Sequence, residues 1–200
     1  ELTGLASTRT KIFEGLPNTG VPVNLRNYSE FQKFMRTLIS ANSIDSIREI
    51  WWDIRPHPSY GTVEVRICDS ISNLVHIKDF TALIQALVVG LSNHYKNGTQ
   101  LPYLDSWIIY ENKWRATRYG MDAKLIVDSN GNQIDIKEVI KETINALEPE
   151  VDYLNIDVSM NNIINRIDHH NPYYKKQINL YNKNKDFKEV ILDSIEDLKK

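Results

Sequence analysis

Hydrophobic and polar residues alternate along positions 51–69 in the manner of two β-strands joined by a loop rich in proline and glycine. If Arg55 lies roughly opposite Thr62, the alternation places charged side chains on one face of this hairpin and apolar side chains on the other. The charged face then holds Trp51, Asp53, Arg55, Thr62, Glu64 and Arg66, and the apolar face holds Ile50, Trp52, Ile54, Val63, Val65 and Ile67. A carboxylate among arginines could bind metal and phosphate together, although an ordinary solvent-facing hairpin with cross-strand ion pairs shows the same pattern.

Most of the remaining chain shows the three- and four-residue spacing of amphipathic helices. One helix is expected to begin at Ser29, with Gln32 completing a capping box, and another is expected over residues 79–95. The expected buried stripes are Phe31, Phe34, Leu38 and Ile39 in the first helix, and Phe80, Leu83, Ile84, Leu87, Leu91 and Tyr95 in the second. Further helices are predicted over residues 104–119, 135–147, 149–167, 172–182 and 186–198.

A second hairpin is predicted over residues 123–136, because Asn130-Gly131 is a strong signal for a two-residue type I′ turn. Asp135 and Asp186 are expected to cap the helices that follow them. Helices packed around few antiparallel strands predict the α+β class.

The composition is that of an ordinary globular protein, with 42% hydrophobic and 25% charged residues among 200. The formal net charge of −2 excludes a strongly basic surface, so no nucleic-acid partner is expected. Cys68 is the single cysteine, which rules out an internal disulfide and fits a reducing cytoplasm. The start at Glu1 has no signal-peptide pattern, and the longest apolar run, 86–91, is too short to cross a bilayer. We therefore expect a cytoplasmic protein without a membrane partner.

Three stretches together resemble the glutamate–cysteine ligase type 2 family of bacterial carboxylate–amine ligases. They are STRTKIFEGLP at 7–17, WWDIRPHPSYGTVEVRICD at 51–69 and ENKWRATRYGMDA at 111–123. The resemblance implies a glutamine-synthetase-like fold, in which antiparallel strands form part of a barrel-like active-site sheet packed by helices. It also implies that residues 1–200 are the C-terminal portion of a single catalytic domain. The missing N-terminal portion of the same protein would then carry further metal ligands and nucleotide contacts.

The activity implied by this resemblance is ATP-dependent joining of L-glutamate and L-cysteine into γ-glutamylcysteine through an acyl phosphate. Such chemistry gathers negative charge and needs hard cations and fixed positive groups. The implied cofactors are ATP and Mg²⁺ or Mn²⁺, and the implied partners are glutamate and either cysteine or another amine. Assembly into a homo-oligomer stays open. So do a related ligase with a different amine acceptor and a non-catalytic binding or assembly domain on the same scaffold.

The resemblance assigns roles to three residues of the first hairpin. Glu64 is expected to bind the metal, Arg66 to contact the transferring phosphoryl group, and Arg55, diagonal to Glu64, to neutralise nucleotide phosphate. The alternative for all three is structural, since Glu64 could simply pair with the two arginines.

Three further residues are expected to bind substrate or ATP. Arg9 falls in the first stretch and would hold the substrate carboxylate, although a surface arginine is an equal alternative. Asn112 and Arg115 fall in the third stretch, where Glu111 and Arg115 could instead form an ordinary helical ion pair.

Overall fold

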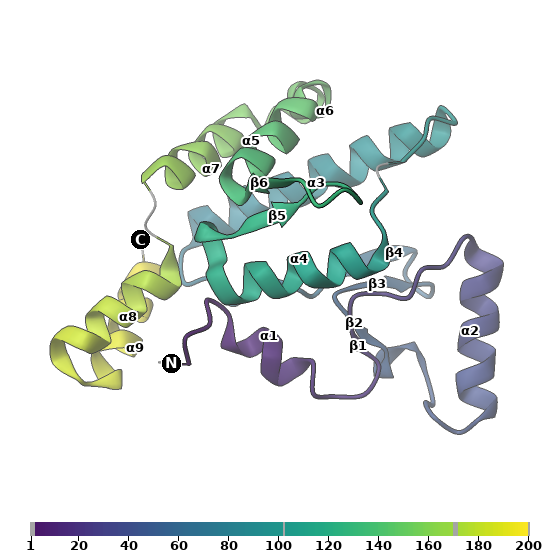
Figure 1. The fold of residues 1–200 in the computed structure, drawn as a ribbon, viewed down its shortest axis with the longest axis horizontal. Helices are drawn as coiled ribbons and strands as arrows, with labels where there is room; N and C mark the ends of the chain where they lie inside the picture. The colour runs from purple at the N-terminus through teal and green to yellow at the C-terminus, as the bar shows by residue number, and fades with distance from the viewer. Residues whose placement is uncertain (1–2, 102, 170–171, 200) are drawn as a thin grey trace. The chain divides into compact units, whose positions relative to one another are not determined.

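The computed structural model describes residues 3–101, 103–169 and 172–199. The chain divides into two compact units: a hairpin unit, Ser7–Asp69, and a helical unit, Glu1–Ala6 with Ser70–Lys200. Within the described residues, helices predominate and the strands form three separate two-stranded sheets, none of them closed into a barrel (Figure 1). The predicted α+β class is therefore confirmed.

The hairpin unit combines two helices with two small sheets. Its elements are α1 (Thr8–Phe13), β1 (Thr19–Gly20), α2 (Tyr28–Ser40), the 3-10 turn η1 (Ile47–Glu49), β2 (Trp51–Trp52), β3 (Ile54–His57) and β4 (Thr62–Val65). β1 pairs with β2 in parallel, and β3 pairs with β4 antiparallel. Arg55 lies opposite Glu64 and His57 opposite Thr62, so the predicted pairing of Arg55 with Thr62 is wrong by two residues. A tight turn over residues 58–61 lets the pairing continue to the end of both strands, and a two-residue shift keeps each side chain on its predicted face.

The core of the hairpin unit is formed by α2, the segment that follows it and β2. Its buried apolar residues are Phe31, Ile44, Ile50 and Trp52. Ile50 and Trp52 confirm part of the predicted apolar face, whereas Ile54, Val63 and Ile67 on the same face are exposed. The buried cluster of this unit contains, among the described residues, no side chain from β3 or β4.

Helix α2 begins earlier than predicted because a different residue caps it. The side chain of Asn27 accepts a hydrogen bond from the backbone N–H of Glu30 at 3.0 Å, so the predicted cap at Ser29 is wrong. Most of the predicted stripe contacts the core. Ile39 is the exception and is exposed, because it lies about 100° round the helix from Leu38.

The helical unit contains seven helices among its described residues, one 3-10 turn and one hairpin. Its elements are α3 (Leu74–Lys96), α4 (Ser106–Tyr119), η2 (Gly120–Asp122), β5 (Lys124–Ile126), β6 (Gln133–Asp135), α5 (Ile136–Ala146), α6 (Glu148–Leu154), α7 (Asp157–His169), α8 (Tyr173–Asn184) and α9 (Phe187–Leu198). Helix α3 contacts α6 and α7, α5 packs on the same pair, and α8 pairs with α9 (Figure 1). The core therefore lies among α3, α5, α6 and α7.

Helix α3 begins at Leu74, five residues before the predicted start. The side chain of Asn73 caps it by accepting a hydrogen bond from the backbone N–H of His76 at 3.1 Å. Asp79, the predicted first residue, lies inside the helix and is 0% exposed. Its carboxylate oxygen Oδ2 accepts a hydrogen bond from Arg166 Nη1 of α7 at 2.8 Å.

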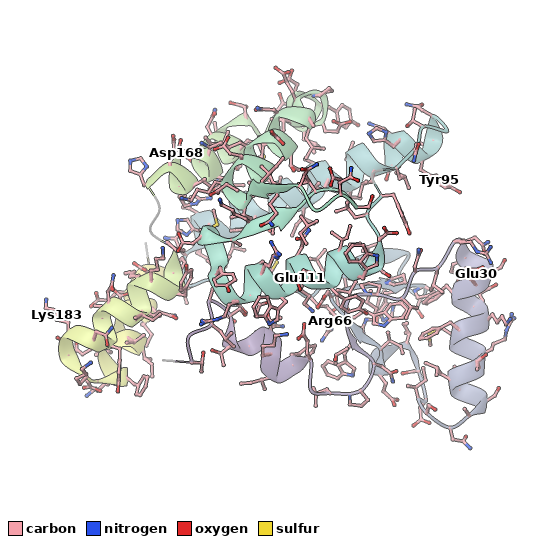
Figure 2. The ribbon with its side chains drawn as sticks, viewed as in Figure 1. Glu30, Arg66, Tyr95, Glu111, Asp168 and Lys183 are labelled. Carbon is pink, nitrogen blue, oxygen red and sulfur yellow. The ribbon has the colours of Figure 1, made fainter. Side chains whose placement is uncertain are left out.

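The buried apolar residues of α3 are small, whereas the predicted core residues Leu83 and Leu87 are partly buried and pack against the same core. Ala82, Ala86 and Gly90 are buried at four-residue spacing, whereas the predicted core residues Phe80, Leu91 and Tyr95 are exposed (Tyr95 is labelled in Figure 2). Small side chains let neighbouring helices approach closely. A Cβ atom added at Gly90 would lie 2.8 Å from Leu147 Cδ2, so the Leu147 side chain would have to shift to admit it.

Helix α3 is also, among the described residues, the helix that is long and apolar enough to cross a membrane by length and composition alone. Core helices pass the same test. In this chain the helix contributes Ala82 and Ala86 to the core of the helical unit and carries the buried Asp79–Arg166 pair.

The hairpin of β5 and β6 is confirmed, but its turn is not the predicted two-residue turn. The loop is built around Asp128, whose Oδ1 accepts hydrogen bonds from the backbone N–H groups of Asn130 at 2.9 Å and Asn132 at 3.1 Å. β6 leads directly into α5, and Asp135 caps this helix as predicted, accepting from Lys137 N–H at 2.9 Å.

The predicted helix over 149–167 is wrong, because this segment forms two helices. Asn155 has a left-handed conformation, with φ of 53°, and ends α6 before α7 begins at Asp157. The last two helices lie close to their predicted bounds. Asp186 caps α9 as predicted, accepting from the backbone N–H of Lys188 at 2.8 Å.

Candidate functional site

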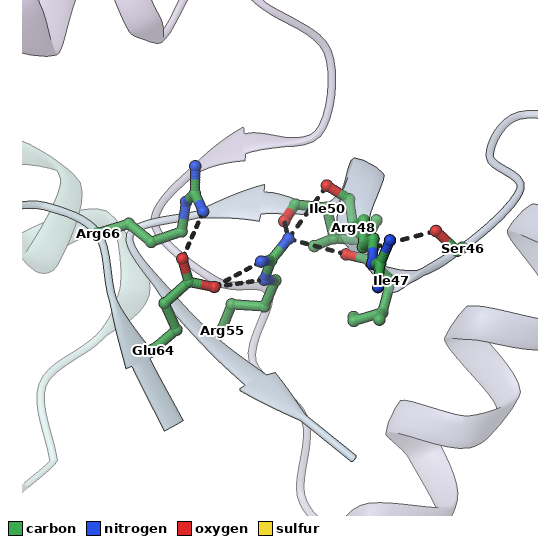
Figure 3. A network of polar contacts seen from close by, with 7 residues as sticks. All are labelled: Ser46, Ile47, Arg48, Ile50, Arg55, Glu64 and Arg66. Carbon is green, nitrogen blue, oxygen red and sulfur yellow. Dashed lines mark hydrogen bonds and ion pairs between the residues drawn. The ribbon is translucent and has the colours of Figure 1, made fainter. Parts of the chain in front are cut away.

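Glu64 is held between two arginines on the charged side of β3 and β4 (Figure 3). Nε of Arg55 donates to Glu64 Oε2 at 3.1 Å, and Nη2 of Arg55 donates to the same oxygen. Nη1 of Arg66 donates to Glu64 Oε1 at 2.7 Å. Arg55 faces Glu64 directly across the sheet, which corrects the expected diagonal arrangement. Both carboxylate oxygens are thus oriented, while the side chain stays 41% exposed and can still reach a ligand.

Arg55 is the buried member of this group, with its side chain 8% exposed. Its Nη1 donates to the backbone carbonyl oxygens of Ile47, Arg48 and Ile50, at distances between 3.1 and 3.2 Å (Figure 3). The guanidinium therefore fastens η1 to the hairpin while it holds Glu64. Because the chain itself uses all three nitrogen atoms, this geometry favours positioning of Glu64 over direct contact with a nucleotide.

The guanidinium of Arg66 lies over an aromatic ring. Its guanidinium carbon is 4.9 Å from the ring centroid of Trp51, and the Trp51 ring meets Phe13 edge-on at 5.6 Å. The side chain of Arg66 is 19% exposed, and its Nε is buried without a hydrogen-bond partner among the described residues. A guanidinium that is oriented in this way and keeps unused donors is suited to bind phosphate or carboxylate oxygens.

Arg9 ties α1 to the segment that follows β4. Its Nη2 donates to the backbone carbonyl of Arg66 at 3.1 Å, and its Nη1 lies 4.0 Å from the carboxylate of Asp69. The guanidinium also lies 5.3 Å from the ring centroid of Phe13. We call the resulting group the hairpin cluster: Arg9, Arg55, Glu64 and Arg66.

In the hairpin cluster two arginines hold the carboxylate of Glu64, and a third, Arg9, contacts the backbone of Arg66. Burial raises the pKa of the Glu64 carboxyl, but the hydrogen bonds and charges of Arg55 and Arg66 outweigh it and lower the pKa below its ordinary value. Glu64 is therefore ionised at neutral pH. Among the described residues, no group of three or more His, Cys, Asp or Glu side chains could hold a metal ion. Any metal at Glu64 would need most of its oxygen ligands from elsewhere.

The other two predicted site residues, Asn112 and Arg115, belong to the helical unit, where both brace β5. Asn112 Nδ2 donates to the carbonyl of Ile126 at 2.8 Å, and Asn112 Oδ1 accepts from the backbone N–H of Ile126 at 2.8 Å. Arg115 donates to Glu111 at 2.9 Å, to the carbonyl of Lys124 at 3.1 Å and to the side chain of Gln133 at 2.9 Å. A direct contact of either residue with substrate stays a prediction that requires some of these bonds to be exchanged.

Two features of the hairpin cluster were missed in the sequence. The contact of Trp51 with Arg66 could have been predicted, because the alternation already places both side chains on one face. The hydrogen bonds from Arg55 to the carbonyls around η1 could not have been predicted, because they depend on a 3-10 turn that no pattern in the sequence indicates.

The order of the three motifs agrees with the ligase family that the sequence resembles. The chain belongs to glutamate–cysteine ligase family 2, whose family model matches residues 1–184. A protein of Frankia alni, provisionally named glutamate–cysteine ligase 2-1, is 44% identical over 147 residues, which are 74% of this chain and 38% of the relative. A glutamate–cysteine ligase 2 of Thermobifida fusca, also provisionally named, is 39% identical over 175 residues, which are 88% of this chain and 44% of the relative.

A third relative matches almost the whole chain. The provisionally named glutamate–cysteine ligase 2 of Bdellovibrio bacteriovorus is 34% identical over 196 residues, covering 98% of this chain and 51% of the relative. The chain therefore spans about half the length, or less, of the curated relatives it matches.

Proposed function

We propose that this chain is the C-terminal portion of a glutamine-synthetase-like catalytic domain in an ATP-dependent carboxylate–amine ligase that joins L-glutamate to L-cysteine. The observation that carries the proposal is the hairpin cluster, in which an ionised, half-exposed carboxylate is oriented by two arginines. The names of the relatives support the pair of substrates. The remainder of the site would be supplied by the whole protein.

The proposed reaction has two steps. A carboxylate oxygen of glutamate attacks the terminal phosphorus of ATP; an O–P bond forms and the bond to the leaving ADP breaks. The amine of cysteine then attacks the carbonyl carbon of the acyl phosphate and loses a proton, and inorganic phosphate leaves. Both steps collect negative charge at one place, which oriented positive groups stabilise in the transition state.

The hairpin cluster supplies such groups. Arg66, whose guanidinium lies over the Trp51 ring and whose side chain is 19% exposed, would contact the transferring phosphoryl oxygens. Arg9, which is partly exposed beside it, would hold a substrate carboxylate. Arg55 would act through Glu64 as a positioning residue, because its own donors are bound to the chain.

Glu64 fits a divalent cation as one ligand among several. It is ionised, and its carboxylate is exposed enough to accept a further contact. Magnesium usually binds through one or two carboxylates together with phosphate oxygens and water, so one protein ligand from this chain is a reasonable share. Mg²⁺ or Mn²⁺ bound there would neutralise phosphate charge during transfer.

The test is release of ADP by the purified full-length protein with ATP, magnesium and glutamate, screened against cysteine and other amines. Glu64→Gln keeps the size of the side chain and removes its charge, and Arg66→Lys keeps the charge and removes the planar fork. We expect each to lower kcat by about 100-fold or more, as loss of one transition-state contact does. Glu30→Gln is the control, because Glu30 is a glutamate of the hairpin unit whose arginine pair, with Arg26, shares no residue with the hairpin cluster.

Three outcomes would contradict the proposal in different ways. ADP release with a different amine, and none with cysteine, would contradict cysteine as the amine substrate but would leave the assignment as a ligase in place. Wild-type rates for both hairpin variants would remove the roles assigned to Glu64 and Arg66. Binding of ATP without turnover under any amine would favour a non-catalytic domain on this scaffold.

A further inference from the structure

Arg9 and Asp69 lie side by side in the hairpin unit without closing into a hydrogen bond. Nη1 of Arg9 is 4.0 Å from Oδ1 of Asp69, and the two side chains are 42% and 47% exposed. A hydrogen bond between charged groups measures about 2.7–2.9 Å, so the two charges attract each other while each can still accept a further partner. We call these two residues the Arg9–Asp69 pair.

The chain holds the guanidinium of Arg9 in place with only part of its donors. Nη2 donates to the backbone carbonyl of Arg66 at 3.1 Å, and Nη1 donates to that of Ile67 at 3.5 Å. The guanidinium also lies over the ring of Phe13, 5.3 Å from its centroid. Because a guanidinium carries five N–H donors, this oriented group can still bind a carboxylate.

The carboxylate of Asp69 is oriented by the residue that caps α1. Oγ of Ser7 donates to Asp69 Oδ1 at 3.0 Å, and the same Oγ accepts from the backbone N–H of Thr10 at 3.3 Å. Asp69 Oδ2 has no hydrogen-bond partner among the described residues. The pair therefore presents one positive and one negative group, both oriented and both partly exposed.

This arrangement matches the head group of an α-amino acid. Its carboxylate and its ammonium are attached to a single carbon atom, so its two opposite charges lie at a similarly short separation. The guanidinium can bind the carboxylate while Asp69 binds the ammonium, and each contact is a hydrogen bond between charged groups. A ligand that lacks one of the two charges would leave one member of the pair without its partner.

The proposed ligase reaction decides which of its two amino acids would bind there. The amine of cysteine attacks the acyl phosphate, so it must react as a neutral amine and cannot stay bound as an ammonium ion. Glutamate reacts through its side-chain carboxylate and keeps both charges of its head group throughout. The Arg9–Asp69 pair therefore fits glutamate.

We propose that the Arg9–Asp69 pair binds the α-carboxylate and the α-ammonium of the glutamate substrate, and that Asp69 selects an amino acid over a simple dicarboxylate. This inference rests on the proposed function and deepens it. With both charges of the head group held, the side-chain carboxylate is the one left to receive the phosphoryl group. The pair would thus direct the joining to the γ position.

The test is calorimetric binding of glutamate, glutarate and 4-aminobutyrate to the full-length protein, with ADP and Mg²⁺ present so that no turnover occurs. Glutarate lacks the ammonium of glutamate, and 4-aminobutyrate lacks its α-carboxylate. Asp69→Asn removes the charge but keeps the size of the side chain and an oxygen that can accept from Ser7. We expect it to weaken glutamate binding about 10- to 100-fold, as loss of a charged hydrogen bond does, and to leave glutarate binding unchanged.

Two further variants complete the series. Arg9→Met should weaken the binding of glutamate and of glutarate by a similar factor and leave 4-aminobutyrate unchanged, because only the first two carry the carboxylate that Arg9 would hold. Asp45→Asn is the matched control, since Asp45 is an exposed aspartate of the same unit that forms no ion pair with the described residues. This variant should bind all three compounds as the wild type does.

Three results would overturn the proposal: no glutamate binding by the wild type, unchanged glutamate binding by Asp69→Asn, or an equal loss for glutamate and glutarate in that variant. The last result would indicate a purely structural role. Failure of the proposed function looks different. The expected binding pattern without ADP release under any amine would support the Arg9–Asp69 pair and refute the ligase. ADP release in which Asp69→Asn keeps the wild-type KM for glutamate would support the ligase and refute the pair.

Discussion

Replacing Arg166 with methionine is expected to be among the most damaging single substitutions in the helical unit. The carboxylate of Asp79 is 0% exposed and accepts its charged hydrogen bond from Arg166. Its other oxygen, Oδ1, is buried without a hydrogen-bond partner among the described residues, and Lys78 Nζ lies 3.7 Å from it. Methionine keeps the aliphatic bulk of arginine but would leave the buried charge without its main partner.

The magnitude follows from the burial of the two partners. Removing one partner of a buried ion pair costs about 3–5 kcal/mol, because the other charge is left uncompensated. Since Arg166 is 29% exposed, water can replace part of the interaction, and we expect a value near the lower end, about 3 kcal/mol. A matched control is Lys141→Met. Its ion pair with Asp168 also joins two helices, at 2.8 Å, but is 30% and 54% exposed, so its loss should destabilise the protein much less (Asp168 is labelled in Figure 2).

The effect has a pH dependence of predictable sign. Burial raises the pKa of Asp79, but Arg166 and its polar neighbours outweigh burial and lower the pKa below its ordinary value. In the wild type the pair therefore contributes stability above the unfolded pKa of about 3.9, and this contribution is lost as the pH falls through the lower folded value. In Arg166→Met, burial would dominate and raise the pKa of Asp79. Protonation then relieves the penalty, so the deficit of the variant should shrink between pH 7 and about pH 4.5.

The assay is urea unfolding of the full-length proteins, followed by far-UV circular dichroism at both pH values. If Arg166→Met loses no more stability than Lys141→Met at neutral pH, the carboxylate of Asp79 does not depend on Arg166. If the deficit stays constant or grows as the pH falls, the reasoning about protonation is wrong.

Three further substitutions test other parts of the structure. Gly90→Val should destabilise the protein by about 1–3 kcal/mol in thermal unfolding, because the larger side chain would displace Leu147 from its packed position. Asn112→Ala should cost about 1–3 kcal/mol and speed hydrogen exchange at the Ile126 amide, because both backbone groups of that residue lose their side-chain partner. Arg55→Met should lower ligase kcat while leaving the KM for ATP nearly unchanged, because it acts through Glu64; a raised KM with normal kcat would indicate direct contact with the nucleotide.

Local signals in the sequence were reliable wherever a short-range rule decided the structure. Asp135 and Asp186 cap their helices as predicted, and the alternation of residues 51–69 puts Arg55, Glu64 and Arg66 on one face. Both features depend on neighbours within a few residues. The family itself could be recognised for the same reason, since its motifs are contiguous.

Tertiary packing decided the features that the sequence did not reveal. In α3 the periodicity suggested a buried stripe of large residues; Leu83 and Leu87 do pack against the core, but Phe80 and Leu91 are exposed, and the most buried apolar positions are the alanines and Gly90. Periodicity identifies an apolar stripe but not which side a neighbouring helix will choose. The role of Arg55 could not be predicted from the sequence either, because its three carbonyl partners belong to the segment around η1, which folds back on the hairpin.

Arg55 links the segment between α2 and β2 to the position of the Glu64 carboxylate, a link that the sequence of this segment does not indicate. One side of its guanidinium donates to backbone carbonyls of residues 47–50, and the other side donates to Glu64. Inserting or deleting one residue in this loop would therefore displace the Glu64 carboxylate, although no residue proposed to contact a ligand would be changed. Loop length here is expected to vary little among proteins that keep both Arg55 and Glu64, even where the loop's side chains differ freely.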